Sequence, residues 1–364
     1  MPRFRAEITA LNPYEVGRPI EDVAREFDLD PDSIIKLTAN ESPEGPFPGV
    51  IDAVSAVLGN ANRYPDNDLW DLSQALAHEL AVPRESLLFG SGSTALISAI
   101  ASAAGGPGTN LVYGWPSFVM YRFAALWSGS GFVEVPLDGN YELDLNAIGN
   151  AINVDTRVVV LCNPNNPTGT IKSADEIEHF IDMVADDVLV VVDEAYHEYV
   201  GDPRYGTAIG LALGRRNVIV LRTFSKIYSL AGFRVGFAIG HAETLAEVRK
   251  AQAPLTVATA SQAAALASLG QPDEVSRRVE ANAAARHYLS GVLAERDMTQ
   301  IASQTNFIFF KMPGHHSDHF STRFTELGVI LRPMSDGWLR VTVGSPGENQ
   351  KFVEALDVVL DRVR

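Results

Sequence analysis

A lysine near the end of an apolar run is the side chain best placed for chemistry in this chain. Residues 218–221 (VIVL) are typical of a buried parallel strand, and Lys226 follows a few positions later. Open α/β sheets bind their ligands at the carboxyl ends of the strands. Lys226 is therefore placed where its amine could hold an aldehyde cofactor, although a solvated loop lysine is the simpler interpretation of this segment alone.

Groups that can bind a phosphate lie close to this lysine in the sequence. Thr223 and Ser225 offer hydroxyl donors, and the guanidinium of Arg234 can bind two phosphate oxygens at once. These side chains predict a phosphate site beside Lys226.

Two further apolar runs also end in polar residues. The first leads into CNPNNPTG at 162–169, and the second leads into DEAY at 193–196. Because such strand ends meet at the ligand-binding edge of an α/β sheet, we expect these polar residues to lie near Lys226. The composition of the first segment is that of a turn, and its Asn166-Pro167 bond is a candidate for the cis form.

These segments resemble the motifs of the fold type I, class I and II aminotransferases, which use pyridoxal 5′-phosphate. The matching motifs, in the family's order, are NPNNPTG at 163–169, DEAY at 193–196, TFSK at 223–226, LAGFRVG at 230–236 and LRVTVG at 339–344. Segments at 12–14, 39–43, 63–65 and 90–93 extend the resemblance to most of the chain. The chain is most similar to the histidinol-phosphate aminotransferase group and its aromatic aminotransferase relatives.

The alternation of short β-branched runs with helical stretches between residues 90 and 240 indicates a parallel sheet covered by helices. The resemblance implies an α/β fold whose large domain holds a mostly parallel seven-stranded sheet, beside a smaller α+β domain. We expect three regions: an N-terminal arm with part of the small domain at 1–40, a large cofactor-binding domain at 41–255, and the small C-terminal domain at 256–364.

The resemblance implies a role for each polar residue at the strand ends. Lys226 would bond to the cofactor aldehyde and then move the proton at the substrate Cα. Asp193 would pair with the pyridinium nitrogen and keep it charged. Tyr196 and Asn166 would donate hydrogen bonds to the ring oxygen O3′. Lys226, Asp193 and Tyr196 are thus the expected catalytic residues.

Other residues are expected to bind the cofactor or the substrate. Ser93 and Thr94, which precede an apolar helical stretch, would meet the phosphate together with Thr223, Ser225 and Arg234. Phe118 aligns with the aromatic residue that stacks on the cofactor ring in the family. The resemblance also implies a homodimer in which Tyr64 reaches the neighbouring cofactor phosphate.

Tyr14, Arg332 and Arg340 are the expected substrate-binding residues, with Arg340 binding a carboxylate by a bidentate contact. The resemblance implies transamination between histidinol phosphate and 2-oxoglutarate in histidine biosynthesis, with glutamate as the product of the second half-reaction. Aromatic amino acid transamination is the main alternative, because Thr94, Leu255 and Phe118 stand where many histidinol-phosphate enzymes carry more polar residues. A threonine-phosphate type of decarboxylase and a non-catalytic cofactor-binding protein are further alternatives.

The composition limits the classes of protein. The chain has 364 residues, of which 46% are hydrophobic, enough for one large core and a smaller one. A formal net charge of −16 argues against nucleic-acid binding, which requires a basic face. Cys162 is the only cysteine, and no apolar stretch reaches membrane-spanning length. We expect a cytoplasmic enzyme with no nucleic-acid or membrane partner.

One histidine cluster invites a metal interpretation. His315, His316 and His319 lie in a polar stretch bounded by Pro and Gly, with Asp318 close by. A solvated loop or the start of a helix explains this pattern better than a metal site, so no metal is expected.

Overall fold

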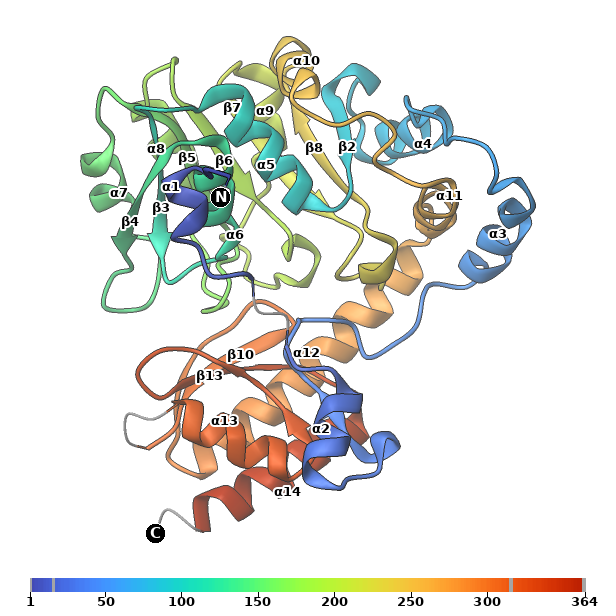
Figure 1. Cartoon of the computed structure of the whole chain (residues 1–364), viewed down its shortest axis with the longest axis vertical. Helices are drawn as coiled ribbons and strands as arrows, with labels where there is room; N and C mark the ends of the chain where they lie inside the picture. The colour runs from blue at the N-terminus through green and yellow to red at the C-terminus, as the bar shows by residue number, and fades with distance from the viewer. Residues whose placement is uncertain (1, 15–16, 314–316, 362–364) are drawn as a thin grey trace.

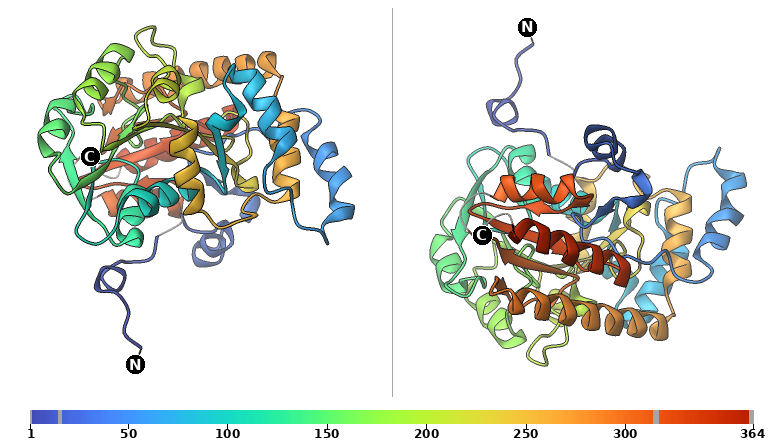
Figure 2. Two further views of the ribbon diagram at one scale, coloured as in Figure 1. Left: turned by 90° about the horizontal axis from the view of Figure 1, so that it is seen from above. Right: turned by 90° about the horizontal axis from the view of Figure 1, so that it is seen from below.

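The computed structural model describes residues 2–14, 17–313 and 317–361. Figure 1 shows a large α/β unit, drawn in cyan, green and yellow, above a smaller unit drawn in orange and red. The N-terminal segment reaches both units: helix α1 (Ala6–Thr9) projects from the large unit and contacts its helix α6 (Met120–Ser128), and helix α2 (Ile20–Phe27) lies beside the small unit (Figure 1, Figure 2).

A seven-stranded sheet forms the centre of the large unit. Its strand order is β2-β8-β7-β6-β5-β3-β4, and every neighbouring pair is parallel except the two pairs that β8 makes. The strands are β2 (Leu87–Gly90), β3 (Asn110–Trp115), β4 (Gly131–Pro136), β5 (Thr156–Cys162), β6 (Leu189–Asp193), β7 (Val218–Thr223) and β8 (Gly236–Gly240). The prediction of a mostly parallel seven-stranded sheet is therefore confirmed.

Helices cover both faces of this sheet because its central strands are apolar on both sides. One buried cluster joins the sheet to α5 (Ser93–Ala104), α6 (Met120–Ser128) and α10 (Ala242–Lys250). The cluster on the other face includes residues of α4 (Trp70–Leu80), α7 (Leu145–Ala151), α8 (Ala174–Met183), α9 (Ile209–Gly214) and α11 (Thr259–Ser268). Helix α3 (Val50–Val57) packs against α11.

The smaller unit is built on an antiparallel sheet of order β12-β13-β10-β9. Its strands are β9 (Thr299–Ile301), β10 (Phe307–Lys311), β12 (Arg332–Pro333) and β13 (Trp338–Thr342), and its helices are α12 (Pro272–Glu295), α13 (Ser317–Glu326) and α14 (Pro346–Asp361). Figure 2 shows from below how these helices lie across the sheet. A separate buried cluster, including Phe310, Phe324 and Phe352, forms their core.

The N-terminal segment joins this unit through a short parallel pair. Strand β1 (Ile35–Lys36) pairs with β11 (Val329–Ile330), and Val23 of α2 packs against Ile34 and Ile330. Helix α11, in contrast, contributes Ala264 and Ala265 to the core of the large unit. We therefore propose that the second domain boundary lies near the start of α12 rather than at residue 256.

In the part of the chain that the structure describes, no helix combines the length and the apolar character needed to cross a membrane.

Candidate active site

A cavity of about 1260 Å³ lies where the carboxyl ends of the central strands meet the small unit. The structure brings together thirteen of the predicted site residues on its walls: Tyr14, Ser93, Thr94, Phe118, Asn166, Asp193, Tyr196, Thr223, Ser225, Lys226, Arg234, Arg332 and Arg340. Tyr64 is the exception among the described site residues, because it lies elsewhere and its side chain is 87% exposed.

Lys226 follows strand β7 and points back to the N-terminal segment. Its Nζ donates hydrogen bonds to the carbonyl oxygens of Ala39 (3.1 Å) and Asn40 (3.0 Å). Burial, reinforced by the positive charge of Arg340, lowers the pKa of Lys226 to about 7. A substantial fraction of this amine is therefore neutral near pH 7, which is the form that attacks an aldehyde.

Asp193 ends the central strand β6, so its carboxylate stands on the floor of the cavity. The side chain is almost completely buried, and burial raises its pKa to about 6. Two donors stabilise the charged form: the hydroxyl of Tyr121 at 2.8 Å from Oδ2 and the backbone N–H of Ala195 at 3.2 Å from Oδ1. Near neutral pH the carboxylate is ionised and able to pair with a buried cation.

A cluster of amides surrounds the hydroxyl of Tyr196. The Nδ2 groups of Asn40 (2.8 Å) and Asn166 (3.4 Å) both donate to this oxygen. Because the oxygen accepts from two amides, its own hydrogen is left to point at a ligand in the cavity. The cis form expected for the Asn166-Pro167 bond is confirmed.

Arg340 reaches this cluster from the small unit. Its guanidinium donates to the Oδ1 atom of Asn166 and to the carbonyl oxygen of Thr38. Burial lowers the pKa of Arg340 to about 10, so it remains a cation at neutral pH. Its Nε is buried and makes no hydrogen bond with the described residues.

A cradle for an anion lies at the N-terminus of α5. The helix begins at Ser93, and Gly92 adopts a φ of +76° that places this N-terminus at the cavity wall. The guanidinium of Arg234 lies directly over Gly92, since a Cβ atom added there would collide with it. On the same wall the hydroxyls of Thr223 and Ser225 lie 2.9 Å apart. Cationic, hydroxyl and backbone donors thus converge on one point.

Aromatic side chains border the rest of the cavity. Phe118 lies edge-on to Tyr121, with ring centroids 5.7 Å apart, and Trp115 also lines the wall. Near the opening, the guanidinium of Arg332 lies 5.8 Å from the ring of Tyr14. The cavity therefore offers flat apolar walls between two groups of cations.

Sequence reasoning missed Tyr121 and the role of Asn40. Tyr121 lies in an apolar helical stretch, where it is indistinguishable from a core residue. Asn40 belongs to a motif that was recognised at 39–43, and that motif was the available signal for its contacts with Lys226 and Tyr196.

The hydroxyl of Tyr121 permits a prediction about pH dependence. Replacing Tyr121 by Phe removes a donor to the Asp193 carboxylate, so the pKa of Asp193 rises above about 6. If activity needs the carboxylate, the loss of rate on acidification begins at a higher pH in Tyr121→Phe, by about one unit. The pH profile of the reaction with the amino donor measures this shift.

Tyr113→Phe is the matched control, because the hydroxyl of Tyr113 bonds to Glu134 instead, at 2.9 Å. Equal profiles for Tyr121→Phe and Tyr113→Phe would show that the Tyr121 contact does not tune Asp193.

The sequence analysis counted Leu255 among the residues that make the site more apolar, but Leu255 does not line this cavity. It lies in a separate depression beside residues 66–69, where its backbone N–H donates to Asn67 Oδ1 at 2.8 Å. Phe118 and Thr94 do line the cavity. Leu255 is therefore not part of the wall of the cavity in its own chain.

The histidine cluster is described in part. His315 and His316 lie outside the described residues, and His319 lies in α13 on the wall of the cavity. Within the described ranges, no group of three or more potential ligands could hold a metal ion.

The chain belongs to the family of class I and II aminotransferases, whose sequence profile matches residues 32–356. It is 38% identical over 356 residues to the aromatic amino acid aminotransferase of Streptomyces avermitilis, covering 98% of this chain and 97% of that protein. It is 36% identical over 365 residues to the histidinol-phosphate aminotransferase of Moorella thermoacetica, covering 99% and 94%. The predicted family is confirmed.

Solved structures show the same relationship. The histidinol-phosphate aminotransferase of Sinorhizobium meliloti, in complex with pyridoxal 5′-phosphate, superposes with a TM-score of 0.92 at 25% identity and covers 100% of this chain and 99% of its own. The threonine-phosphate decarboxylase of Porphyromonas gingivalis, at a TM-score of 0.78 and 21% identity over 90% of this chain and all of its own, shares the fold.

The residues of the cavity fit pyridoxal 5′-phosphate. The cradle of Ser93, Ser225 and Arg234 supplies donors for a phosphate, and the buried Asp193 supplies an anion for a pyridinium nitrogen. Lys226, with its lowered pKa, supplies the amine that an aldehyde requires.

Proposed function

We propose that this chain is a pyridoxal 5′-phosphate-dependent aminotransferase that exchanges the amino group of histidinol phosphate with 2-oxoglutarate. The charge of the cavity carries this proposal. Its described walls hold Lys36, Lys226, Arg234, Arg332 and Arg340 against Glu41, Asp193 and Asp336. The whole chain has a net charge of −16, but the cavity wall has more cationic than anionic side chains. This local positive charge favours anionic ligands. The cofactor phosphate would bind at Arg234, and the positive charge of the rest of the cavity would attract a substrate phosphate or carboxylate.

The mechanism follows from where each side chain stands. When bound, the cofactor supplies a ring that accepts the electrons released from the substrate Cα. Asp193 would hold the proton of the ring nitrogen, and Tyr121 and Ala195 would keep this carboxylate charged and in place. Tyr196 would donate its free hydrogen to the ring oxygen, because its lone pairs are taken by Asn40 and Asn166.

Lys226 would hold the cofactor and then serve as the base. The Lys226 amine, whose pKa is lowered to about 7, would take the proton from the substrate Cα and hold it, since it can exist in both protonation states near neutral pH. Histidinol phosphate has no carboxylate, so Arg340 would act on the glutamate side of the reaction, where it would hold the α-carboxylate near the plane of the ring and leave the Cα–H bond as the one to break. Such a placement favours transamination over decarboxylation.

A homodimer is part of the proposal. Exposed apolar side chains occur in or near the helices α3, α4 and α11, which pack together: Ile51, Leu58, Tyr64, Trp70, Leu255 and Leu266. An apolar surface of this kind is typical of a subunit interface. A second copy seated there would cover Tyr64 and would place Tyr64 and Leu255 where they could reach the neighbouring site. A cytoplasmic location stays a prediction.

Aromatic transamination is the second candidate, and the walls of Trp115 and Phe118 favour it together with the Streptomyces relative. Single-turnover conversion of the loaded enzyme to its amine form separates the two. We expect histidinol phosphate to react about tenfold faster than phenylalanine, or more, at equal low concentration. Phenylalanine lacks the phosphate, and the loss of one hydrogen bond to a charged group lowers the rate by about this factor. A faster reaction with phenylalanine would overturn the proposed substrate in favour of the aromatic one.

A further inference from the structure

A turn of the large unit carries a strained aromatic residue that contacts the small unit. Tyr141 lies in the loop between β4 and α7 and has a φ of +61°, a conformation that residues other than glycine rarely adopt. Such strain persists only where the surrounding structure enforces it, and it is concentrated at functional positions.

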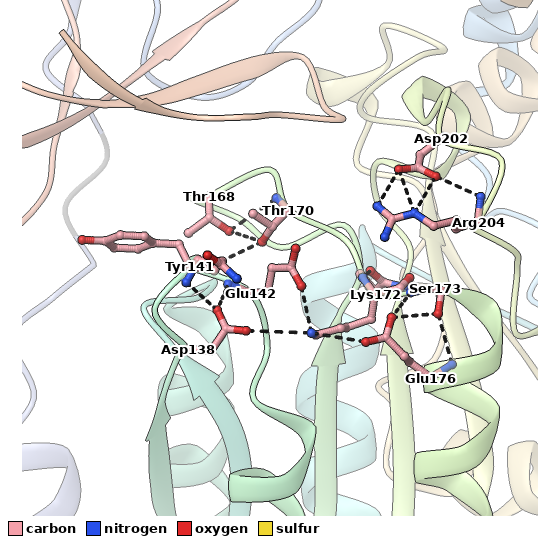
Figure 3. Close-up of polar contacts among 12 residues, drawn as sticks. Asp138, Tyr141, Glu142, Thr168, Thr170, Lys172, Ser173, Glu176, Asp202 and Arg204 are labelled. Atoms are coloured by element: carbon pink, nitrogen blue, oxygen red, sulfur yellow. Dashed lines mark hydrogen bonds and ion pairs between the residues drawn. The ribbon is translucent and has the colours of Figure 1, made fainter.

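The turn is held by a network of polar side chains. The Asp138 carboxylate accepts from the backbone N–H groups of Asn140 (2.8 Å) and Glu142 (2.9 Å), while Lys172 binds Glu142 at 2.8 Å. Lys172 also lies 3.4 Å from Glu176 of α8. Figure 3 shows the backbone of Tyr141 inside this network and its ring projecting away from Asp138 and Lys172. The turn is therefore fixed to the large unit with its ring free to contact something else.

The ring of Tyr141 packs on two aromatic residues of the small-unit sheet. Its centroid lies 4.9 Å from that of Trp338 and 6.1 Å from that of Phe309, and these two rings stack on each other at 4.3 Å. Phe309 is the cross-strand partner of Arg340, and Trp338 lies two residues before Arg340 in β13. All three side chains therefore share one face of that sheet.

The same turn is connected to the loop that carries Asn166. The hydroxyl of Thr170 donates to the carbonyl oxygen of Tyr141 at 2.8 Å and lies 2.7 Å from the hydroxyl of Thr168. Asn165 in turn donates to Thr168 at 3.0 Å, next to Asn166, which Arg340 contacts. The turn and this loop thus contact the small unit at several points: at Trp338, at Arg340, and at Gln304, whose backbone N–H donates to the carbonyl oxygen of Gly169 at 2.8 Å.

We propose that Tyr141 is a positioning residue for substrate binding: its ring, clamped on Phe309 and Trp338, sets the place of Arg340 relative to the large-unit half of the cavity. The inference rests on the proposed role of Arg340 as the carboxylate-binding residue. Without the ring, the face of the sheet that carries Arg340 loses its aromatic contact with the large unit, and the loop at 165–170 holds the small unit through Asn166 and Gly169.

The test is a double-mutant cycle on Tyr141→Leu and Arg340→Ala, with Tyr141→Phe as the matched variant that keeps the ring. We expect Tyr141→Leu to raise the KM for 2-oxoglutarate, the substrate with carboxylates, about fivefold, the effect that one lost aromatic contact allows, with little change in the saturating rate. Tyr141→Phe should behave as the native chain. In the Arg340→Ala background, Tyr141→Leu should have no further effect on KM.

Calorimetric binding of 2-oxoglutarate to the loaded protein gives a readout that needs no turnover. We expect its Kd to rise by the same factor in Tyr141→Leu and to be unaffected by Tyr288→Leu, a surface control on α12. Additive effects of the Tyr141 and Arg340 substitutions, or a lower thermal stability of Tyr141→Leu with unchanged Kd and KM, would overturn the inference. A native protein that binds 2-oxoglutarate but converts no amino donor would refute the proposed function instead and would leave the binding cycle to decide on Tyr141.

Discussion

Lys226→Ala abolishes transamination, with a fall in rate of about 10⁴-fold, the upper end of what a positioned general acid and base supplies. Two lysines among the described residues line the cavity, Lys36 and Lys226, and it is the Nζ of Lys226 that lies 5.6 Å from the centre of the Tyr196 ring. Its pKa near 7 gives it both the neutral form that bonds an aldehyde and the protonated form that returns a proton. Alanine offers neither form.

The measurement is single-turnover conversion with histidinol phosphate, together with the absorbance of the covalently held cofactor, which Lys226→Ala should lack. Lys250→Ala is the control, because Lys250 is an exposed residue of α10 that pairs with Glu247. If Lys226→Ala kept both the absorbance and more than a tenth of the rate, the assignment of Lys226 would be wrong.

Asp193→Asn is expected to lower the rate by roughly 10²- to 10⁴-fold, since breaking a buried charge pair costs about 3 to 5 kcal/mol and each 1.4 kcal/mol is tenfold. The amide has the shape of the carboxylate but cannot keep a proton on the ring nitrogen of the cofactor. Because the side chain is 2% exposed, water does not replace the missing charge.

Rapid-reaction rates at saturating amino donor measure this loss, and Asp187→Asn, an exposed change just before β6, is the control. The cofactor should still bind Lys226 in Asp193→Asn. A rate within a factor of five of the native value would show that the ring nitrogen needs no anionic partner here.

Much of the fold could be predicted from the sequence because apolar runs and turn residues act locally. The runs ending at Cys162, Asp193 and Thr223 became β5, β6 and β7, and the polar residues after them met at one edge of the sheet. Helix α11 was harder, because its alanine-rich pattern does not tell which core it joins.

The site was predicted less completely, since several of its contacts join residues far apart in the chain. The carbonyl oxygens that accept from Lys226 belong to Ala39 and Asn40, in a segment that matches the family at 39–43 but whose residue pattern does not indicate which side chain it contacts. The role of Tyr121 could not be predicted for a different reason. In the sequence a buried helical tyrosine is indistinguishable from other core aromatic residues, and only the structure shows its hydroxyl beside Asp193.

The pairing of β1 with β11 has a consequence for how the chain acquires its structure during synthesis. Strand β1 cannot pair with β11 until Val329 has left the ribosome, about 300 residues after Ile35. Arg340 is synthesised later still. The seven-stranded sheet can form from residues 87–240 before either arrives, since domains fold as units during translation. A nascent chain therefore passes through a stage with a finished large sheet, an unpaired N-terminal strand and half a cavity, and activity appears only when the last few dozen residues have emerged.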